Sequence, residues 1–208
     1  VEVEHGTEFH ALRVAAVIEE THDAKSFVLE VPPELARAFS YRAGQFLTFR
    51  IPWAELRIAR CYSLSSSPET GEPPKVTVKR VDGGRVSNWL NDRLSPGDRI
   101  EVRPPAGAFL LRDDADRPLC LFAGGSGITP IISLIKAALA TTRRRIRLVY
   151  ANRDARSVIF ETELESLVRS HPGRLTLHHH LDEKSGLLGA RELTALVEDF
   201  TGADFYVC

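Results

Sequence analysis

The sequence predicts a two-domain protein of the β plus α/β class, a six-stranded antiparallel barrel followed by a doubly wound parallel sheet. Three observations predict this arrangement. Short runs of strand-forming residues fill the first half of the 208-residue chain, with one helical stretch among them. From Pro118 onward, apolar runs alternate with segments of helical spacing, and a glycine-rich loop follows the first of these runs. We expect the domains to span residues 1–113 and 114–208.

The expected barrel strands are short and bounded by turn residues. Pro32 and Pro33 end the second strand, because proline lacks the amide hydrogen that continues a ladder, and the third strand is entered through Gly44. Trp89, Leu90 and Leu94 lie at helical spacing, and a helix is expected over 82–92. Two strands joined by a turn at 21–24 fill residues 12–31, and four more occupy 41–51, 60–65, 75–81 and 98–102.

The second half alternates between strands and helices, which is typical of parallel strands joined by crossover helices. Thr129 is expected to be the N-cap of the first helix and Pro130 its first residue. The expected strands are 119–123, 145–150, 174–180 and 204–207, and the expected helices are 130–140, 157–168 and 190–197.

A polar strand at residues 60–63 is the first candidate site. Arg60 and Tyr62 would share one face of the strand, with Cys61 and Ser63 on the other. An arginine that binds phosphate and an aromatic ring that packs on a flat ring suit flavin adenine dinucleotide, FAD. The alternative is an ordinary barrel strand with polar residues facing the solvent.

The start of the expected helix at 82–92 is a candidate phosphate site. Glycine lets the backbone approach a ligand closely, and a helix N-terminus offers unpaired N–H groups to an anion. Gly84, Arg85, Val86 and Ser87 would hold a pyrophosphate together with Arg60. The alternative is a Gly-Gly turn followed by a capped surface helix.

The glycine-rich loop from Gly124 to Pro130 is a candidate dinucleotide site, because such loops between a strand and a helix cradle phosphate. Gly125, Ser126 and Gly127 form its centre. The loop departs from the dinucleotide fingerprint, since Pro130 stands where a third glycine is usual and no acidic residue ends the second strand.

Composition excludes several classes of function. The formal net charge of -1 gives no electrostatic case for nucleic acid or an anionic membrane. No apolar run is long enough to cross a bilayer and residues 1–5 lack signal-peptide features, so we expect a cytoplasmic protein. Three widely spaced cysteines are expected to be reduced thiols.

No metal site is expected. His178, His179 and His180 are consecutive residues on a strand and point alternately to opposite faces, so the three together cannot chelate one ion. The arginines at 143–145 are interpreted as a solvated turn between helix and strand.

Four stretches together resemble the ferredoxin-NADP reductase superfamily: Arg60, Tyr62 and Ser63, the turn at 84–87, the loop at 125–130 and Cys208. More narrowly, the motifs at 9–12, 41–46 and 152–160 resemble the reductase components of multicomponent oxygenases, similar to those of 3-ketosteroid 9α-hydroxylase and phenylacetyl-CoA epoxidase. Members of this group carry a last helix and strand that we expect to be missing after Cys208.

The resemblance implies a role for each site residue. Arg60 would bind flavin phosphate, Tyr62 would pack on the flavin, and Ser63 would hydrogen-bond near its N5 atom. Thr129 and Cys208 would lie beside the nicotinamide, and Cys208 could equally be an inert thiol. The remaining residues implied to contact a cofactor are Cys61, Val78, Lys79, Val81, Gly84, Arg85, Val86 and Ser87 for FAD, and Gly125, Ser126, Gly127, Pro130, Asn152, Arg153 and Phe160 for the dinucleotide.

The resemblance also implies the reaction, in which a nicotinamide cofactor gives a hydride to FAD and electrons pass singly to an iron–sulfur partner. Arg153 and Arg156 favour NADPH and Asp154 favours NADH, and the narrower resemblance favours NADH. The chain lacks a Cys-x4-Cys-x2-Cys run, so a two-iron two-sulfur cluster is expected only in a ferredoxin domain absent from this chain, with a terminal oxygenase as final partner. The alternatives are a free flavin reductase, a flavohaemoglobin-type reductase and a non-catalytic flavin-binding regulator.

Overall fold

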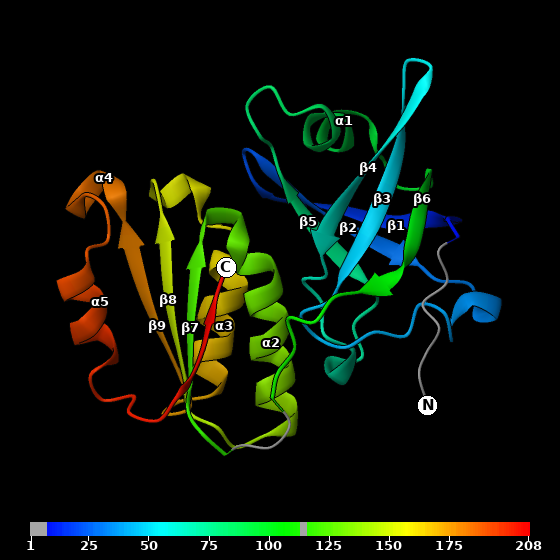
Figure 1. Cartoon of the computed structure of the whole chain (residues 1–208). Helices are drawn as coiled ribbons and strands as arrows, with labels where there is room; N and C mark the ends of the chain where they lie inside the picture. The colour runs from blue at the N-terminus through cyan, green and yellow to red at the C-terminus, as the bar shows by residue number, and fades with distance from the viewer. Residues whose placement is uncertain (1–7, 113–115) are drawn as a thin grey trace.

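The computed structural model describes residues 8–112 and 116–208. Two sheets, one antiparallel and one parallel, stand side by side with helix α2 between them (Figure 1). This confirms the predicted fold class. The expected domain boundary between residues 113 and 114, and the first five residues, lie outside the described residues.

The first sheet is antiparallel, with strand order β4-β3-β6-β1-β2-β5. A single bridge between Leu64, which follows β4, and Val76 of β5 joins the two edge strands of this sheet and closes the barrel on that side. Alternate residues face a common core, among them Leu12, Phe27 and Phe49, all fully buried. Its elements are β1 (His10–Thr21), β2 (Ala24–Glu30), β3 (Phe46–Trp53), β4 (Leu56–Ser63), β5 (Lys75–Lys79), helix α1 (Arg85–Arg93) and β6 (Arg99–Ala106), with single turns at Pro33–Leu35 and Pro68–Thr70.

The second sheet is parallel, with strand order β10-β7-β8-β9. Its core joins apolar residues of the strands with helix α2, which is buried along almost its whole length. Its elements are β7 (Leu119–Gly124), α2 (Ile128–Thr141), β8 (Ile146–Asn152), α3 (Glu161–Ser170), β9 (Leu175–Leu181), α4 (Asp182–Ser185), α5 (Ala190–Val197) and β10 (Asp204–Val207). Across the described part of the chain, no helix combines the length and apolar character needed to cross a bilayer.

Two helices begin later or earlier than the sequence predicts. Helix α2 begins at Ile128, because the 3-10 turn Gly125–Gly127 runs directly into it, so Thr129 is not its N-cap. The Thr129 hydroxyl instead donates to the Ser126 carbonyl at 3.1 Å. Helix α3 begins at Glu161, because Phe160 adopts a left-handed conformation (φ 63°) that separates it from the preceding turn.

The interpretation of residues 143–145 as a solvated turn is wrong for Arg144. Its side chain is 1% exposed and forms an ion pair with Asp204, at the start of β10. Its guanidinium also donates to the carbonyl of Arg117, ahead of β7. Arg144 therefore fixes the first residues of two neighbouring strands.

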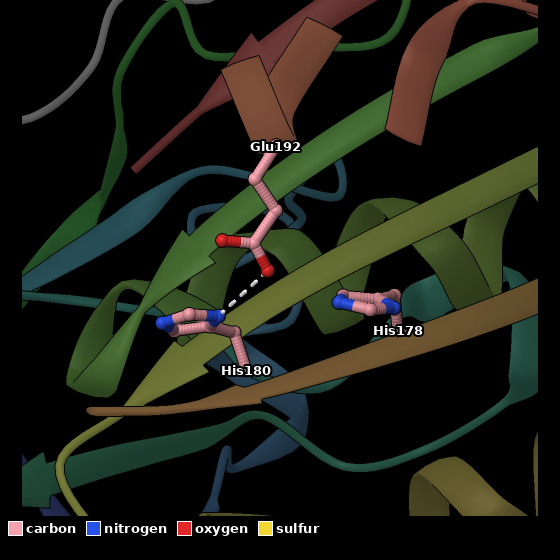
Figure 2. A group of neighbouring side chains, drawn as sticks. All are labelled: His178, His180 and Glu192. Carbon is pink, nitrogen blue, oxygen red and sulfur yellow. Dashed lines mark hydrogen bonds and ion pairs between the residues drawn. The ribbon is translucent and has the colours of Figure 1, made fainter. Parts of the chain in front are cut away.

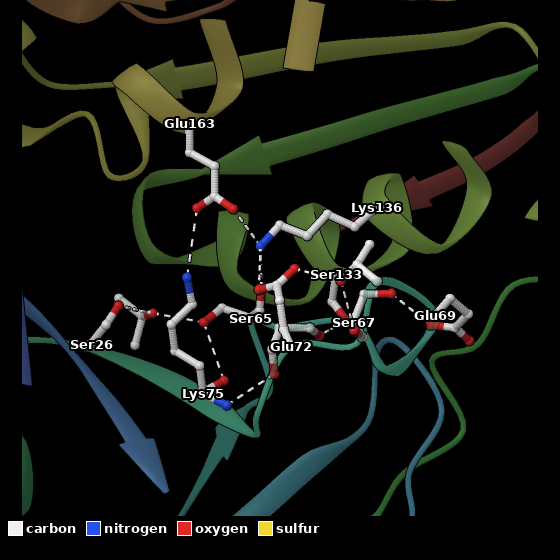
Figure 3. A network of polar contacts seen from close by, with 12 residues as sticks. Ser26, Ser65, Ser67, Glu69, Glu72, Lys75, Ser133, Lys136 and Glu163 are labelled. Atoms are coloured by element: carbon white, nitrogen blue, oxygen red, sulfur yellow. Dashed lines mark hydrogen bonds and ion pairs between the residues drawn. The ribbon is translucent and has the colours of Figure 1, made fainter. Parts of the chain in front are cut away.

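An ion-pair cluster joins the barrel to the parallel sheet (Figure 3). Lys136 of α2 is 3% exposed, and its ammonium lies 2.9 Å from a carboxylate oxygen of Glu72, which belongs to the barrel. Lys136 also pairs with Glu163 of α3. Lys75 of β5 lies 3.6 Å from Glu163, so opposite charges alternate across the boundary.

Close backbone approach reinforces the same boundary. The Gly44 amide donates to the Ser133 hydroxyl at 3.3 Å, and that hydroxyl donates to the Ser66 carbonyl at 2.6 Å. Gly44 has φ +91°, and a Cβ atom there would lie 1.9 Å from the Phe109 carbonyl oxygen. Only glycine fits this position, because any side chain would collide with the Phe109 backbone. These close contacts help to fix the barrel against helix α2.

Candidate functional site

A cleft of about 870 Å³ lies between the barrel and the parallel sheet. This volume is within the range of pockets that hold a small molecule or part of a dinucleotide. Strands β4 and β5 and the start of α1 form one wall, and the loop after β7 and the end of the chain form the other. The residues that line it are Ile58, Arg60, Cys61, Tyr62, Ser63, Thr77, Lys79, Val81, Gly83, Gly84, Arg85, Val86, Ser87, Gly124, Ser126, Gly127, Thr129 and Cys208.

Strand β4 contributes its predicted polar residues to the cleft. Because β4 is an edge strand of its sheet, residues from both faces border the cleft, and Cys61 and Ser63 line it beside Arg60 and Tyr62. The Tyr62 ring packs edge-on against Phe49, with ring centroids 5.8 Å apart. Burial raises the pKa of Tyr62 to about 12, so its phenol is neutral at physiological pH and can donate a hydrogen bond.

Arg60 is an exposed cation of this wall. Its guanidinium donates one hydrogen bond, to the Ala59 carbonyl at 2.8 Å, and a guanidinium has further N–H groups that can donate to a ligand. A guanidinium with several donors binds phosphate well. Arg60 therefore fits the predicted role.

Helix α1 presents its N-terminus to the cleft. Gly84 is the N-cap residue, and Arg85, Val86 and Ser87 follow it in the first turn. The Ser87 hydroxyl accepts from the Val81 amide at 3.2 Å, which closes the turn onto the helix. A Cβ atom on Gly84 would lie 2.6 Å from that hydroxyl, so a side chain there would displace the turn. The close backbone at Gly84, the N-terminal end of the helix dipole and the nearby Arg60 together suit a bound pyrophosphate.

Strand β5 is the other edge of the barrel sheet and borders the cleft through Lys79 and the following Val81. Val78 differs from its neighbours, because its side chain is 1% exposed in the barrel core. The Val78 carbonyl accepts a hydrogen bond from the Asn91 side chain at 3.1 Å. Val78 does not line the cleft, so a flavin contact by Val78 stays a prediction.

The glycine loop faces the barrel wall with three of its predicted residues, Ser126, Gly127 and Thr129. Gly125 does not line the cleft, and its carbonyl accepts from the Tyr150 hydroxyl at 3.0 Å. Pro130 is buried inside helix α2. The loop thus offers small residues and a helix start to a ligand.

Cys208 lies beside the glycine loop, held by main-chain hydrogen bonds. Its amide donates to the Phe122 carbonyl at 3.0 Å and its carbonyl accepts from the Gly124 amide at 2.9 Å. A Cβ atom on Gly127 would lie 2.3 Å from the Cys208 carbonyl oxygen, which explains glycine there. Burial raises the pKa of the Cys208 thiol, so the thiol is neutral at physiological pH.

Three residues of the motif at 152–160 do not line the cleft. Asn152 is 4% exposed and Phe160 is 3% exposed, with the Phe160 ring in the core beneath α3. Arg153 is exposed, and its carbonyl accepts from the Glu183 amide at 2.9 Å. Their contacts with a dinucleotide stay predictions, and the position of Phe160 gives no support for a direct one.

Three residues that line the cleft are absent from the sequence prediction, Ile58, Thr77 and Gly83, and Gly124 is expected only as the first residue of the glycine-rich loop. Gly83 and Gly124 each adjoin a predicted glycine, Gly84 and Gly125, so the two Gly-Gly pairs in the sequence indicate both positions. No sequence signal indicates Thr77, because its hydroxyl forms hydrogen bonds to the hydroxyls of Ser26 at 2.7 Å and Ser65 at 2.8 Å, and both residues are distant in sequence.

Comparison with known proteins gives two family matches and several relatives. Residues 11–110 match the oxidoreductase FAD-binding domain, and residues 121–208 match the oxidoreductase NAD-binding domain. The ferredoxin reductase component of 3-ketosteroid-9-alpha-monooxygenase from Rhodococcus rhodochrous is 48% identical over 209 aligned positions, which cover 100% of this chain and 59% of the relative. One of the polypeptides of 1,2-phenylacetyl-CoA epoxidase from Escherichia coli is 37% identical over 174 positions, 82% of this chain and 49% of the relative.

Solved structures share the fold. The cytochrome P450 reductase GcoB from Amycolatopsis aligns with a TM-score of 0.78 and 25% identity, over 100% of this chain and 63% of that one. A ferredoxin-NADP+ reductase from Plasmodium falciparum aligns with a TM-score of 0.80 and 20% identity, over 96% of this chain and 85% of that one.

The family matches coincide with the two sheets that form the cleft. The chain spans a little over half the length of the 3-ketosteroid-9-alpha-monooxygenase reductase components that it matches. Its cleft combines the expected phosphate-binding groups of the barrel with the glycine loop of the parallel sheet. The chain belongs to the oxidoreductases that join an FAD-binding domain, here residues 11–110, to an NAD-binding domain, here residues 121–208.

Proposed function

We propose that this chain is the part of an oxygenase reductase component that takes electrons from NADH and delivers them to a two-iron two-sulfur ferredoxin domain. One observation carries the proposal: Arg60 and Ser63 of the barrel border the same cleft as Thr129 and Cys208 of the parallel sheet. A flavin held by the first pair would therefore lie against a nicotinamide held by the second.

The chain's own residues would bind, orient and exclude water. Arg60 and the N-terminus of α1 would neutralise the FAD pyrophosphate, and the neutral Tyr62 phenol would pack on the flavin and donate a hydrogen bond. Ser63 would hydrogen-bond at the edge of the flavin ring. Bound FAD would accept a hydride and release single electrons, which is chemistry that no side chain supplies.

On the parallel-sheet side, the loop at Ser126 and Gly127 would hold dinucleotide phosphate, and Thr129 and Cys208 would border the nicotinamide. The neutral thiol of Cys208 would contact the ring without reacting with it. Packing of both ring systems in one cleft would supply the alignment on which hydride transfer depends.

NADH is the proposed donor, supported by the likeness to oxygenase reductase components rather than by a charge in the cleft. Asp154 is committed to a turn, since its carboxylate accepts from the Ser157 amide at 3.0 Å. Arg153 is exposed nearby and leaves NADPH possible. We expect a lower Michaelis constant for NADH in a diaphorase assay, and a strong preference for NADPH would overturn this choice.

The partners are also part of the proposal. The relatives are named as a ferredoxin reductase component and a part of an epoxidase, and this chain spans only part of them. We infer a ferredoxin domain from the same parent chain and a terminal oxygenase, acting in the cytoplasm where NADH is available.

The phosphate assignment is tested by replacing Arg60. Arg60→Ala is expected to weaken FAD binding at least about tenfold, because a charge-assisted phosphate contact is lost. Arg57→Ala is the matched control, an arginine on the same strand that pairs with Glu101 and does not line the cleft. Titration of FAD fluorescence measures both, and equal affinity of Arg60→Ala and the wild type would refute the assignment.

Electron transfer separates the alternatives. Turnover of ferricyanide with NADH would exclude the non-catalytic regulator. Faster reduction of a two-iron two-sulfur ferredoxin than of free flavin or haem would support the oxygenase reductase, and the reverse order would support a flavin reductase or flavohaemoglobin-type reductase.

A further inference from the structure

Two of the three consecutive histidines lie on one face of strand β9, together with a glutamate of helix α5 (Figure 2). The predicted alternation holds, since His179 packs against Tyr150 with ring centroids 5.9 Å apart. The same alternation places residues i and i+2 on one face. His178 and His180 therefore converge with Glu192, and their ligand atoms all lie within 4.8 Å of one another.

The hydrogen bonds of His180 point to a cation at this place. Its side chain is 2% exposed, and its Nε2 atom lies 2.7 Å from the Gly186 carbonyl oxygen and 3.6 Å from an Asp182 carboxylate oxygen. A carbonyl oxygen can only accept a hydrogen bond, so Nε2 carries a proton. The other ring nitrogen, Nδ1, lies 3.2 Å from a Glu192 carboxylate oxygen, so in a neutral ring its lone pair would face that oxygen.

A lone pair and a carboxylate oxygen at that separation repel each other unless a positive charge lies between them. A proton can fill this place, and so can a metal ion. Histidines that bind metal through one nitrogen commonly donate from the other to a carbonyl or carboxylate, which is the arrangement of Nε2 here.

We propose that His178, His180 and Glu192 form a binding site for a divalent transition-metal ion, with Zn²⁺ as the preferred ion and water as a fourth ligand. Two imidazoles and a carboxylate form a ligand set that Zn²⁺ accepts in tetrahedral geometry. Ligand atoms about 3.3 Å apart suit metal–nitrogen bonds of about 2.0 Å. Glu192 is exposed and His178 is partly exposed, so rotation of these side chains can close the remaining gap.

Such an ion would join α5 to the edge of the sheet. Strand β9 ends the order β10-β7-β8-β9, and Glu192 is a side-chain link from α5 to this strand. None of the three ligands lines the cleft. The site is therefore distinct from the cofactor site, and its failure would leave the proposed reductase function intact.

The experiment uses the full chain loaded with FAD and freed of metal with a chelator. Zn²⁺ binding is measured by calorimetry, and Co²⁺ is added as a visible-absorbing probe of tetrahedral coordination. We expect one ion per chain, and a metal-dependent shift of the ring-nitrogen NMR signals of His178 and His180 while those of His179 stay in place.

Three variants locate the site. His178→Gln and Glu192→Gln are each expected to weaken binding at least about tenfold, as loss of one ligand does. His179→Gln is the matched control, because its ring lies on the opposite face of β9, and it should bind like the wild type. At a Zn²⁺ concentration 100 times the dissociation constant, the folded-to-unfolded ratio should rise about 100-fold.

Retention of wild-type affinity in both His178→Gln and Glu192→Gln would overturn the proposal, and so would shifts confined to other histidines or absent binding. In those cases the Nδ1 position belongs to a proton, and His180 and Glu192 form an ion pair only. Normal FAD reduction by NADH in all three variants is expected, which keeps the outcome separate from that of the reductase proposal.

Discussion

Replacement of Lys136 by methionine tests how the two domains are held together at the cleft. Methionine keeps most of the volume of the buried stem and removes the ammonium, with its ion pairs and its 3.4 Å hydrogen bond to the Ser65 carbonyl. In Figure 3 the ammonium lies between Glu72 of the barrel and Glu163 of the parallel-sheet domain. The substitution would leave two carboxylates facing each other across the boundary.

The cost follows from burial of the partners. Loss of one partner of a fully buried ion pair costs about 3 to 5 kcal/mol, because an uncompensated charge remains. Glu72 and Glu163 are 29% and 34% exposed, and Glu163 keeps Lys75 at 3.6 Å, so water and the second lysine reduce the penalty. We expect Lys136→Met to lower the free energy of unfolding by about 2 kcal/mol.

Urea denaturation followed by circular dichroism at pH 7 measures the loss. Arg169→Met is the matched control, since Arg169 forms an exposed ion pair with Glu165 on helix α3 and should change stability by less than about 0.5 kcal/mol. The double variant Lys136→Met/Glu163→Gln should recover about 1 kcal/mol, because one of the unpaired carboxylates is removed. A loss no greater than that of Arg169→Met, or strict additivity in the double variant, would refute the reasoning.

Three further predictions concern single positions. Gly127→Ala should lower both stability and NADH affinity, because its Cβ atom would meet the carbonyl of the last residue, whereas Gly124→Ala meets nothing within 4 Å and should keep wild-type stability in thermal melts. Ellman's reagent should modify the exposed Cys61 thiol quickly, and more slowly once FAD fills the cleft that Cys61 lines. The buried Cys120 thiol, whose pKa burial raises to about 11, should react only after unfolding. A reaction of Cys61 that FAD does not slow would count against the site. Burial raises the pKa of Glu20, so its contribution to stability is full below its unfolded-state pKa and is lost as the pH rises through the folded-state pKa. Glu20→Gln should therefore flatten the pH dependence of the free energy of unfolding and stabilise the chain at pH 7 to 8. Urea denaturation at several pH values measures both effects.

The sequence was sufficient where one short-range pattern decides the structure. Alternation along β strands and the change to helical spacing after Pro118 predicted both sheets, because each pattern allows one buried face. Glycine pairs predicted the start of α1 and the loop after β7, since both need close backbone approach. Residues Arg60 to Ser63 were likewise found from their order in the chain.

Features that depend on distant partners were missed. Arg144 reads as a surface residue until Asp204, 60 positions away, is placed beside it. Strand β4 begins at Leu56, because Ala54 turns the chain at φ 51°, and Phe160 delays helix α3 in the same left-handed region. Left-handed conformations are uncommon for residues other than glycine, so no local sequence pattern predicts them at Ala54 and Phe160. The convergence of His178 and His180 with Glu192 needed the position of α5.

Rapid mixing with NADH under anaerobic conditions tests the shared cleft most directly. The FAD-loaded chain should lose its blue absorbance as NADH reduces the flavin, and Ser63→Ala should keep its FAD content while this loss becomes slower. FAD that stays oxidised in the presence of NADH, or a chain that takes up no FAD, would contradict the placement of both cofactors in one cleft.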